Sequence, residues 1–143
     1  MQKNLAPYRV IYGDTDQMGV VYYANYLRWF EMGRTELLRQ IGATYSSVEE
    51  AGFFFPVTEV SCRYLKPARF DDEITVETTL SELSRATLDF SYKISRKSDG
   101  QLLAEGWTRH ACVNREGKVT KISPAFEATL KTALSSAPKE KSL

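Results

Sequence analysis

Two aspartates and a glycine near the N-terminus are the residues of this 143-residue chain best suited to chemistry. They lie in the run Asp14-Thr15-Asp16-Gln17-Met18-Gly19-Val20-Val21-Tyr22-Tyr23-Ala24-Asn25-Tyr26, which leads into a segment with helical periodicity. A carboxylate can attack a carbonyl carbon or activate water. The free N–H groups at a helix start can stabilise the negative charge that then develops on the carbonyl oxygen. This motif (residues 14–26) therefore predicts hydrolysis at a helix N-terminus.

Few other side chains offer an alternative catalytic centre. The chain has one histidine, His110, and two cysteines, Cys62 and Cys112, and it lacks serine-hydrolase, zinc-protease and phosphate-loop motifs. These three residues do not form a ligand set, so we expect no metal and no other cofactor. We expect His110 to be a hydrogen-bonded core residue and Glu59, the other carboxylate considered as a base, to be a solvated strand residue. A thioester suits so small a set of groups, because its thiol, with a pKa of about 8.5, leaves with little acid assistance.

The elements that must position the motif are predicted from hydrophobic periodicity. The segment Tyr8–Tyr12 is expected to form a strand that leads into the motif. From Asn25, the expected N-cap, apolar residues recur every three or four positions to Ile41, which predicts one long amphipathic helix that stops at Gly42. Gly33 lies within the apolar stripe and indicates close packing on a sheet.

The rest of the chain alternates with a period of two after a short helical turn near 45–51. Four strands are expected, at residues 54–65, 74–81, 88–95 and 102–114, joined as an antiparallel meander with an Asp99-Gly100 hairpin turn. A terminal helix is expected over 125–134. The pattern predicts an α+β fold in which one long central helix is wrapped by a curved antiparallel sheet. We expect a single domain over residues 1–134 and a flexible tail over 135–143.

Composition argues against several classes of function. A net charge of +1 without a basic run gives no electrostatic footprint for nucleic acid. No stretch reaches the roughly 18 apolar residues of a membrane span, and the N-terminus lacks the apolar core of a signal peptide. Two widely separated cysteines fit a reducing compartment. We therefore expect a cytoplasmic protein that does not insert into membranes.

The motif and its neighbours resemble hotdog-fold acyl-CoA thioesterases of the 4-hydroxybenzoyl-CoA thioesterase family. The resemblance covers most of the chain: residues 12–38, Tyr64-Leu65-Lys66-Pro67-Ala68-Arg69-Phe70-Asp71-Asp72 and Gly106-Trp107-Thr108-Arg109-His110-Ala111-Cys112-Val113. It implies a hotdog fold, with Asp16 as the catalytic carboxylate and the backbone N–H of Tyr23 polarising the thioester carbonyl. One large branch of the family has histidine where Tyr23 stands, and this departure leaves the chemistry to Asp16.

The expected substrate is an acyl thioester of coenzyme A or of acyl carrier protein. Beside Asp16, four residues are expected to contact it: Gly19, Val21, Tyr22 and Tyr26. Flat aromatic side chains there, with no basic side chain placed against the acyl group, favour a neutral aroyl or alkyl group over a dicarboxylic one. Arg85, and with less support Lys66 and Arg69, are expected to contact the phosphates of coenzyme A. Ordinary solvated charge is the alternative for these three.

Surplus aromatic surface and an unpaired sheet edge predict a homodimer, or a tetramer built from dimers, with each active site formed by both chains. Two other functions are compatible with the sequence. A hotdog dehydratase or hydratase on acyl thioesters would need His110 paired with an acidic residue, and His110 is poorly placed in the sequence for that. A non-catalytic acyl-CoA-binding or assembly module is the other, and Asp16 beside Gly19 argues against it.

Overall fold

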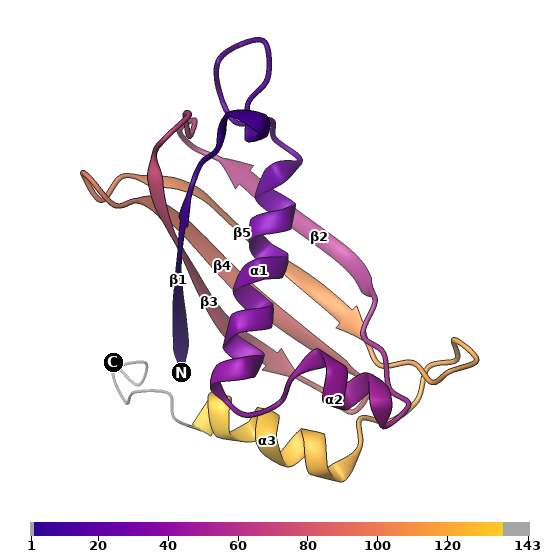
Figure 1. Ribbon diagram of the computed structural model, residues 1–143. Helices are drawn as coiled ribbons and strands as arrows, with labels where there is room; N and C mark the ends of the chain where they lie inside the picture. Colours follow the sequence, from indigo (N-terminus) through magenta and orange to yellow (C-terminus); the bar gives the residue numbers. More distant parts are fainter. Residues whose placement is uncertain (1, 136–143) are drawn as a thin grey trace.

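A five-stranded antiparallel sheet forms one layer of the protein, and helix α1 lies across one face of it (Figure 1). The computed structural model describes residues 2–135. The strands are β1 (Lys3–Arg9), β2 (Val57–Tyr64), β3 (Glu73–Leu83), β4 (Thr87–Arg96) and β5 (Leu102–Ala111). The helices are α1 (Asn25–Gln40), α2 (Tyr45–Glu50) and α3 (Pro124–Ser135), and a 3-10 turn spans Tyr12–Asp14. The α2 and α3 helices lie at the end opposite the loop that precedes α1 (Figure 1).

The strand order is β1-β3-β4-β5-β2, so the predicted four-strand meander is wrong. Only β3, β4 and β5 follow one another as neighbours, while β2 pairs with β5 and β1 pairs with β3. The segment over residues 65–72 is not a tight turn, because it carries the chain from the β2 edge across the end of the sheet to β3. Both β1 and β2 are therefore edge strands.

Three predicted strands have boundaries that differ from the observed ones by three residues or more. The strand expected over 102–114 ends at Ala111. The first strand was expected at Tyr8–Tyr12 and lies at Lys3–Arg9, with Pro7 in it. An edge strand tolerates proline, since one side of its backbone needs no partner in the sheet. The strand expected from Phe54 begins at Val57, and Phe54 forms only an isolated bridge with Val113.

Helix α1 meets the expectation of a long central helix only in part, because it has 16 residues. Its buried face consists of Tyr26, Trp29, Phe30, Gly33, Leu37 and Leu38. The predicted close approach at Gly33 is confirmed, since a Cβ there would lie 2.2 Å from Thr78 Oγ1. The Phe30 ring stacks on Tyr92 at 4.1 Å and fills the space that a side chain at Gly106 would occupy.

The predicted N-cap is wrong by one residue. Ala24 is the N-cap and Asn25 is the first helical residue. The Asn25 side chain donates instead to the backbone oxygen of Asp14, at 2.9 Å, so it holds the motif rather than the helix end.

At the other end of the chain, α3 packs against the sheet, and its Phe126, Leu130 and Ala133 are buried. The helix includes Ser135, one residue beyond the predicted domain boundary, and the remainder of the predicted tail, 136–143, lies outside the described residues. Among residues 2–135 no helix is long and apolar enough to cross a membrane.

Candidate active site

The motif forms a loop whose two ends are held by one segment, Ala68–Asp72. Before the loop, Val10 N donates to Asp72 O at 2.9 Å and Val10 O accepts from Asp71 N at 2.9 Å. After the loop, Val21 N donates to Ala68 O at 2.9 Å. Because both ends are tied to the same short segment, the geometry of Ala68–Asp72 sets the geometry of the loop.

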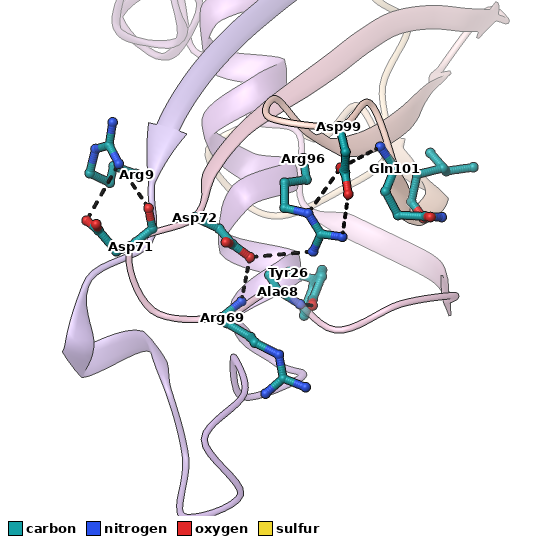
Figure 2. Close-up of polar contacts among 10 residues, drawn as sticks. Arg9, Tyr26, Ala68, Arg69, Asp71, Asp72, Arg96, Asp99 and Gln101 are labelled. Carbon is teal, nitrogen blue, oxygen red and sulfur yellow. Dashed lines mark hydrogen bonds and ion pairs between the residues drawn. The ribbon is translucent and has the colours of Figure 1, made fainter.

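Ion pairs fasten this segment to its surroundings (Figure 2). Asp72 accepts from Arg69 N at 2.9 Å and lies 3.7 Å from the guanidinium of Arg96. Arg96 also donates to Asp99 at 3.1 and 3.0 Å, and this lowers the pKa of Asp99. On the other side, Arg9 donates to Asp71 O at 2.9 Å. Asp71 has a φ of 72°, a left-handed conformation that costs a non-glycine residue energy, and these contacts hold it.

Asp14 shapes the loop from inside. It is 2% exposed, and its Oδ2 accepts from the Tyr8 hydroxyl at 2.8 Å and from Ile11 N at 3.0 Å. Its backbone oxygen accepts from Tyr22 N at 2.9 Å. Burial and the Asp14 carboxylate together raise the pKa of Tyr8. These contacts give Asp14 a structural role in the loop.

Asp16 is exposed at the tip of the loop. Its Oδ1 accepts from Met18 N at 2.8 Å, and within residues 2–135 its other carboxylate oxygen has no hydrogen bond. Gly19 closes the turn with a φ of 78° and donates its N–H to Asp16 O at 3.0 Å. Asp16 N donates to Val20 O at 2.9 Å. The turn therefore presents one free carboxylate oxygen from a backbone that is held in place.

A pocket of about 250 Å³ lies between the start of α1 and the end of β2. It is lined by Val20, Val21, Tyr23, Tyr26, Tyr64, Leu65, Lys66 and Pro67. Tyr26 is buried, and its hydroxyl accepts from Ala68 N at 3.1 Å. The Tyr64 ring meets Tyr26 edge-on at 5.1 Å. Asp16 N donates to Val20 O, and Val20 lines this pocket. The turn that carries the free carboxylate oxygen therefore adjoins the pocket.

The start of α1 supplies free hydrogen-bond donors beside the pocket. Within residues 2–135 the backbone N–H groups of Tyr23 and Ala24 make no hydrogen bond. The carbonyls of Tyr22 and Tyr23 are engaged, with Asn25 N at 2.9 Å and with the Tyr64 hydroxyl at 3.0 Å. Free N–H groups and the positive end of the helix dipole suit a developing oxyanion.

The structure places three of the predicted site residues in the lining of this pocket, while Asp16 and Gly19 lie on the adjacent turn outside the lining. Val21, Tyr23 and Tyr26 line the pocket, and Gly19 forms the turn that carries Asp16. The Tyr22 ring lies tilted against that of Tyr23, with the ring centroids 4.7 Å apart, and Tyr22 is 45% exposed, outside the pocket lining. Lys66 also lines this pocket, although no basic side chain was expected beside the acyl group.

Arg85 is the predicted contact that the chain does not bring to the others. It lies in the β3–β4 turn, where its backbone oxygen accepts from Ile122 N at 2.9 Å, at the α3 end of the sheet (Figure 1). Lys66 and Arg69 lie instead on the segment that borders the loop, and neither side chain forms an ion pair within the described part of the chain.

His110 and Glu59 occupy the places that were predicted for them. His110 is 1% exposed, with Nδ1 2.9 Å from Phe55 O and Nε2 2.8 Å from Thr108 Oγ1, so both ring nitrogens are engaged. Burial lowers its pKa to about 4. Glu59 is exposed on β2, 3.2 Å from the guanidinium of Arg109. Neither residue borders the pocket beside the motif.

Comparison with known proteins places the chain in a family. The model of the thioesterase-like superfamily matches residues 10–130. The acyl-CoA thioesterase YbgC of Haemophilus influenzae is 38% identical over 128 residues, which are 89% of this chain and 90% of the relative. The structure of hypothetical protein TT1821 from Thermus thermophilus superposes with a TM-score of 0.86 at 37% identity, covering 92% of this chain and 98% of that one.

A DHNA-CoA thioesterase from Staphylococcus aureus superposes with a TM-score of 0.89 at 26% identity, covering 94% of this chain and 93% of that one. The matches confirm the predicted family of hotdog acyl-CoA thioesterases and the predicted enzyme class, a thioester hydrolase. The chain belongs to the thioesterase-like superfamily.

Proposed function

We propose that the protein hydrolyses acyl-CoA thioesters to a free acid and coenzyme A, with Asp16 as the nucleophile or the general base. The observation that carries the proposal is the free carboxylate oxygen of Asp16 on the loop that borders a tyrosine-lined pocket, beside the free N–H groups of Tyr23 and Ala24. These are the two parts that thioester hydrolysis needs, a group that starts the attack and donors that receive the oxyanion.

The reaction follows from this arrangement. The thioester carbonyl lies against the helix start, where its oxygen accepts hydrogen bonds from the free N–H groups. Asp16 either attacks the carbonyl carbon, forming an acyl anhydride that water then hydrolyses, or removes a proton from a water that attacks directly. In both routes the tetrahedral intermediate collapses, the carbon–sulfur bond breaks, and the thiolate of coenzyme A leaves and is protonated.

Lys66 and Arg69 are our candidates for contact with the phosphates of coenzyme A. Both are exposed cations on the segment that borders the loop, and neither is paired with a carboxylate in residues 2–135. Arg85 could serve such a role only toward a site on a partner subunit, since it lies at the other end of its own sheet. The same pocket could accept a thioester of acyl carrier protein, whose phosphopantetheine arm shares the thiol.

The acyl group that the aromatic walls of the pocket favour is flat. Tyr23, Tyr26 and Tyr64 give the pocket aromatic walls, and Val20 and Val21 add apolar surface. Aromatic walls favour an aroyl group by offset or edge-on contact with its ring. The name of the Staphylococcus aureus relative, a DHNA-CoA thioesterase, supports an aromatic acyl group here as well.

The protein is further proposed to work as a homodimer, or as a tetramer of dimers, in the cytoplasm. The β2 edge has no partner strand among the described residues and bears exposed Val57 and Val60, at 45% and 48%. Pairing of two such edges would extend the sheet and bring α1 to the centre of the assembly, in the hotdog arrangement.

A hydrolysis screen tests the function. Purified protein is incubated with acetyl-, hexanoyl-, palmitoyl- and benzoyl-CoA, and the release of free thiol is followed with a chromogenic disulfide. We expect at least one substrate to be turned over by the wild type and none by Asp16→Asn. Binding of acyl-CoA without thiol release from any substrate would instead favour the non-catalytic binding module.

A further inference from the structure

Tyr64, the last residue of β2, is joined to the start of α1 by its hydroxyl. The hydroxyl donates to the backbone oxygen of Tyr23 at 3.0 Å. Its ring meets Tyr26 at 5.1 Å and Tyr23 at 6.3 Å, both edge-on. Burial raises the pKa of Tyr64, so its hydroxyl stays protonated and able to donate. One side chain thus links an edge strand to the backbone of the candidate site.

The hydrogen bond fixes a peptide group whose N–H is free. A trans peptide is planar, so the N–H of Ala24 points opposite to the carbonyl of Tyr23, and the N–H of Tyr23 points opposite to the carbonyl of Tyr22. Asn25 N holds the Tyr22 carbonyl at 2.9 Å. The Tyr23 carbonyl is held by Tyr64 and, at 3.3 Å, by Tyr26 N. The hydrogen bonds to the Tyr23 and Tyr22 carbonyls therefore fix the directions of the free N–H groups of Ala24 and Tyr23, respectively.

We propose that Tyr64 is a positioning residue for hydrolysis: it holds the Tyr23–Ala24 peptide so that the N–H of Ala24 meets the oxyanion. The neighbouring N–H of Tyr23 belongs to the peptide that Asn25 N holds through the Tyr22 carbonyl. This inference rests on the function proposed above. A hydrogen bond to a carbonyl also polarises the peptide and strengthens its N–H as a donor. Because the oxyanion exists only near the transition state, the loss of Tyr64 should lower kcat more than it changes KM.

The orientation of the peptide can be observed without any substrate. Tyr23-Ala24 is the only Tyr-Ala pair in the sequence. Protein labelled with ¹³C at tyrosine carbonyls and ¹⁵N at alanine therefore gives a single carbonyl–amide correlation in solution NMR, from this peptide. We expect Tyr64→Phe to shift that signal. The control is Tyr12→Phe, since the Tyr12 side chain is 78% exposed and its hydroxyl has no hydrogen bond in residues 2–135; this variant should leave the signal in place. An unmoved signal in Tyr64→Phe would overturn the proposal.

Kinetics supply the second readout. With a substrate found in the screen, Tyr64→Phe should lower kcat about fivefold, in line with the loss of one neutral hydrogen bond, and leave KM within about twofold. Its thermal midpoint should match that of Tyr12→Phe, which separates positioning from loss of fold. If the wild type is active and Tyr64→Phe keeps its kcat, only this inference fails. If the wild type hydrolyses no acyl-CoA, the proposed function fails with it, whatever the NMR signal shows.

Discussion

At the scale of single residues, Asp14 and Asp16 receive opposite surroundings although one residue separates them. The Asp14 carboxylate is buried and accepts two hydrogen bonds at its Oδ2. The Asp16 carboxylate is exposed and accepts one, at its Oδ1. A buried, bonded carboxylate maintains structure, whereas an exposed one with a free oxygen can react. Exposure and hydrogen bonding thus distinguish two side chains that composition cannot.

Substitution of Asp16 tests this assignment. Asp16→Asn should reduce kcat by about 100-fold or more, because the amide keeps the shape but loses the negative charge that attacks or removes a proton. Asp14→Asn is the matched control: it should keep most of the kcat and lose about 1 to 2 kcal/mol of unfolding free energy, since a charged acceptor of two hydrogen bonds is replaced. Thiol release and urea unfolding measure both variants. An active Asp16→Asn beside an inactive Asp14→Asn would reverse the roles.

His110 makes the stability of the fold depend on pH. Its pKa is lowered from 6.5 to about 4 by burial, so the unfolded chain takes up the proton first as the pH falls. The stability that comes from neutral His110 is therefore present above pH 6.5, and is lost as the pH falls from there to about 4. Between pH 7 and pH 5 the loss should be about 2 kcal/mol. Urea unfolding at both pH values should show a smaller loss for His110→Gln; an identical loss would contradict the assignment.

At the scale of elements, Gly33 lets α1 lie against β3. A Cβ at this position would lie 2.2 Å from Thr78 Oγ1 and 2.9 Å from Val76 Cγ1. Gly33→Ala should therefore cost about 1 to 3 kcal/mol of unfolding free energy, although alanine is the better helix former. Thr78 is buried and its hydroxyl has no hydrogen-bond partner among the described residues. The double variant with Thr78→Ala should be more stable than Gly33→Ala alone, and equal stability would show that the contact is not the cause.

The segment Ala68–Asp72 and its neighbour Lys66 form the element that should hold coenzyme A. Lys66→Glu should raise KM for an acyl-CoA about tenfold with kcat nearly unchanged, since a phosphate contact acts on ground and transition states alike. Lys131→Glu, an exposed lysine of α3, is the charge-matched control and should change neither constant. The corresponding acyl-pantetheine lacks the nucleotide, so its KM should not respond to Lys66→Glu. A rise of equal size on both substrates would contradict the phosphate contact.

Elements that rest on local periodicity were predictable from the sequence. The apolar stripe of α1 and the Asp99-Gly100 turn both follow from rules that relate neighbours in the chain. The position of β2 beside β5 was not predictable in this way. The sequence pattern of β2 identifies a strand but not its partner, and no local pattern in residues 65–72 shows that they cross the end of the sheet.

In the candidate site, too, contacts between residues close in sequence were predictable and contacts between distant residues were not. Asp16, Gly19, Val21, Tyr23 and Tyr26 belong to one run of sequence, so a local motif could predict their proximity. The hydrogen bond from Tyr64 to Tyr23 joins residues 41 positions apart, and no local rule predicts it. Arg85 shows the same dependence on topology, because its place in a turn indicates exposure but not the end of the sheet at which that turn lies. The distance between residues far apart in the sequence can be predicted only when the order of the strands in the sheet is known.

At the scale of the whole molecule, the β2 edge should join two copies of the chain. This strand pairs only with β5, and it bears Val57 and Val60, which are 45% and 48% exposed. Together with Leu27, at 38%, these residues line a pocket of about 290 Å³ between α1 and β2. A long unpaired edge with apolar side chains invites pairing with another strand, and two-fold symmetry would pair β2 with its own copy.

Light scattering on the wild type should therefore give a mass of two or four times 16.3 kDa. Val60→Lys places a charge on the proposed contact and should shift the protein to the monomer, with loss of hydrolysis because each active site is expected to draw on both chains. The control is Val119→Lys, which changes an exposed valine, at 68%, that lies outside β2. This variant should keep both the mass and the activity of the wild type. If the wild type has a mass of 16.3 kDa under the conditions in which it hydrolyses acyl-CoA, one chain is sufficient to form an active site.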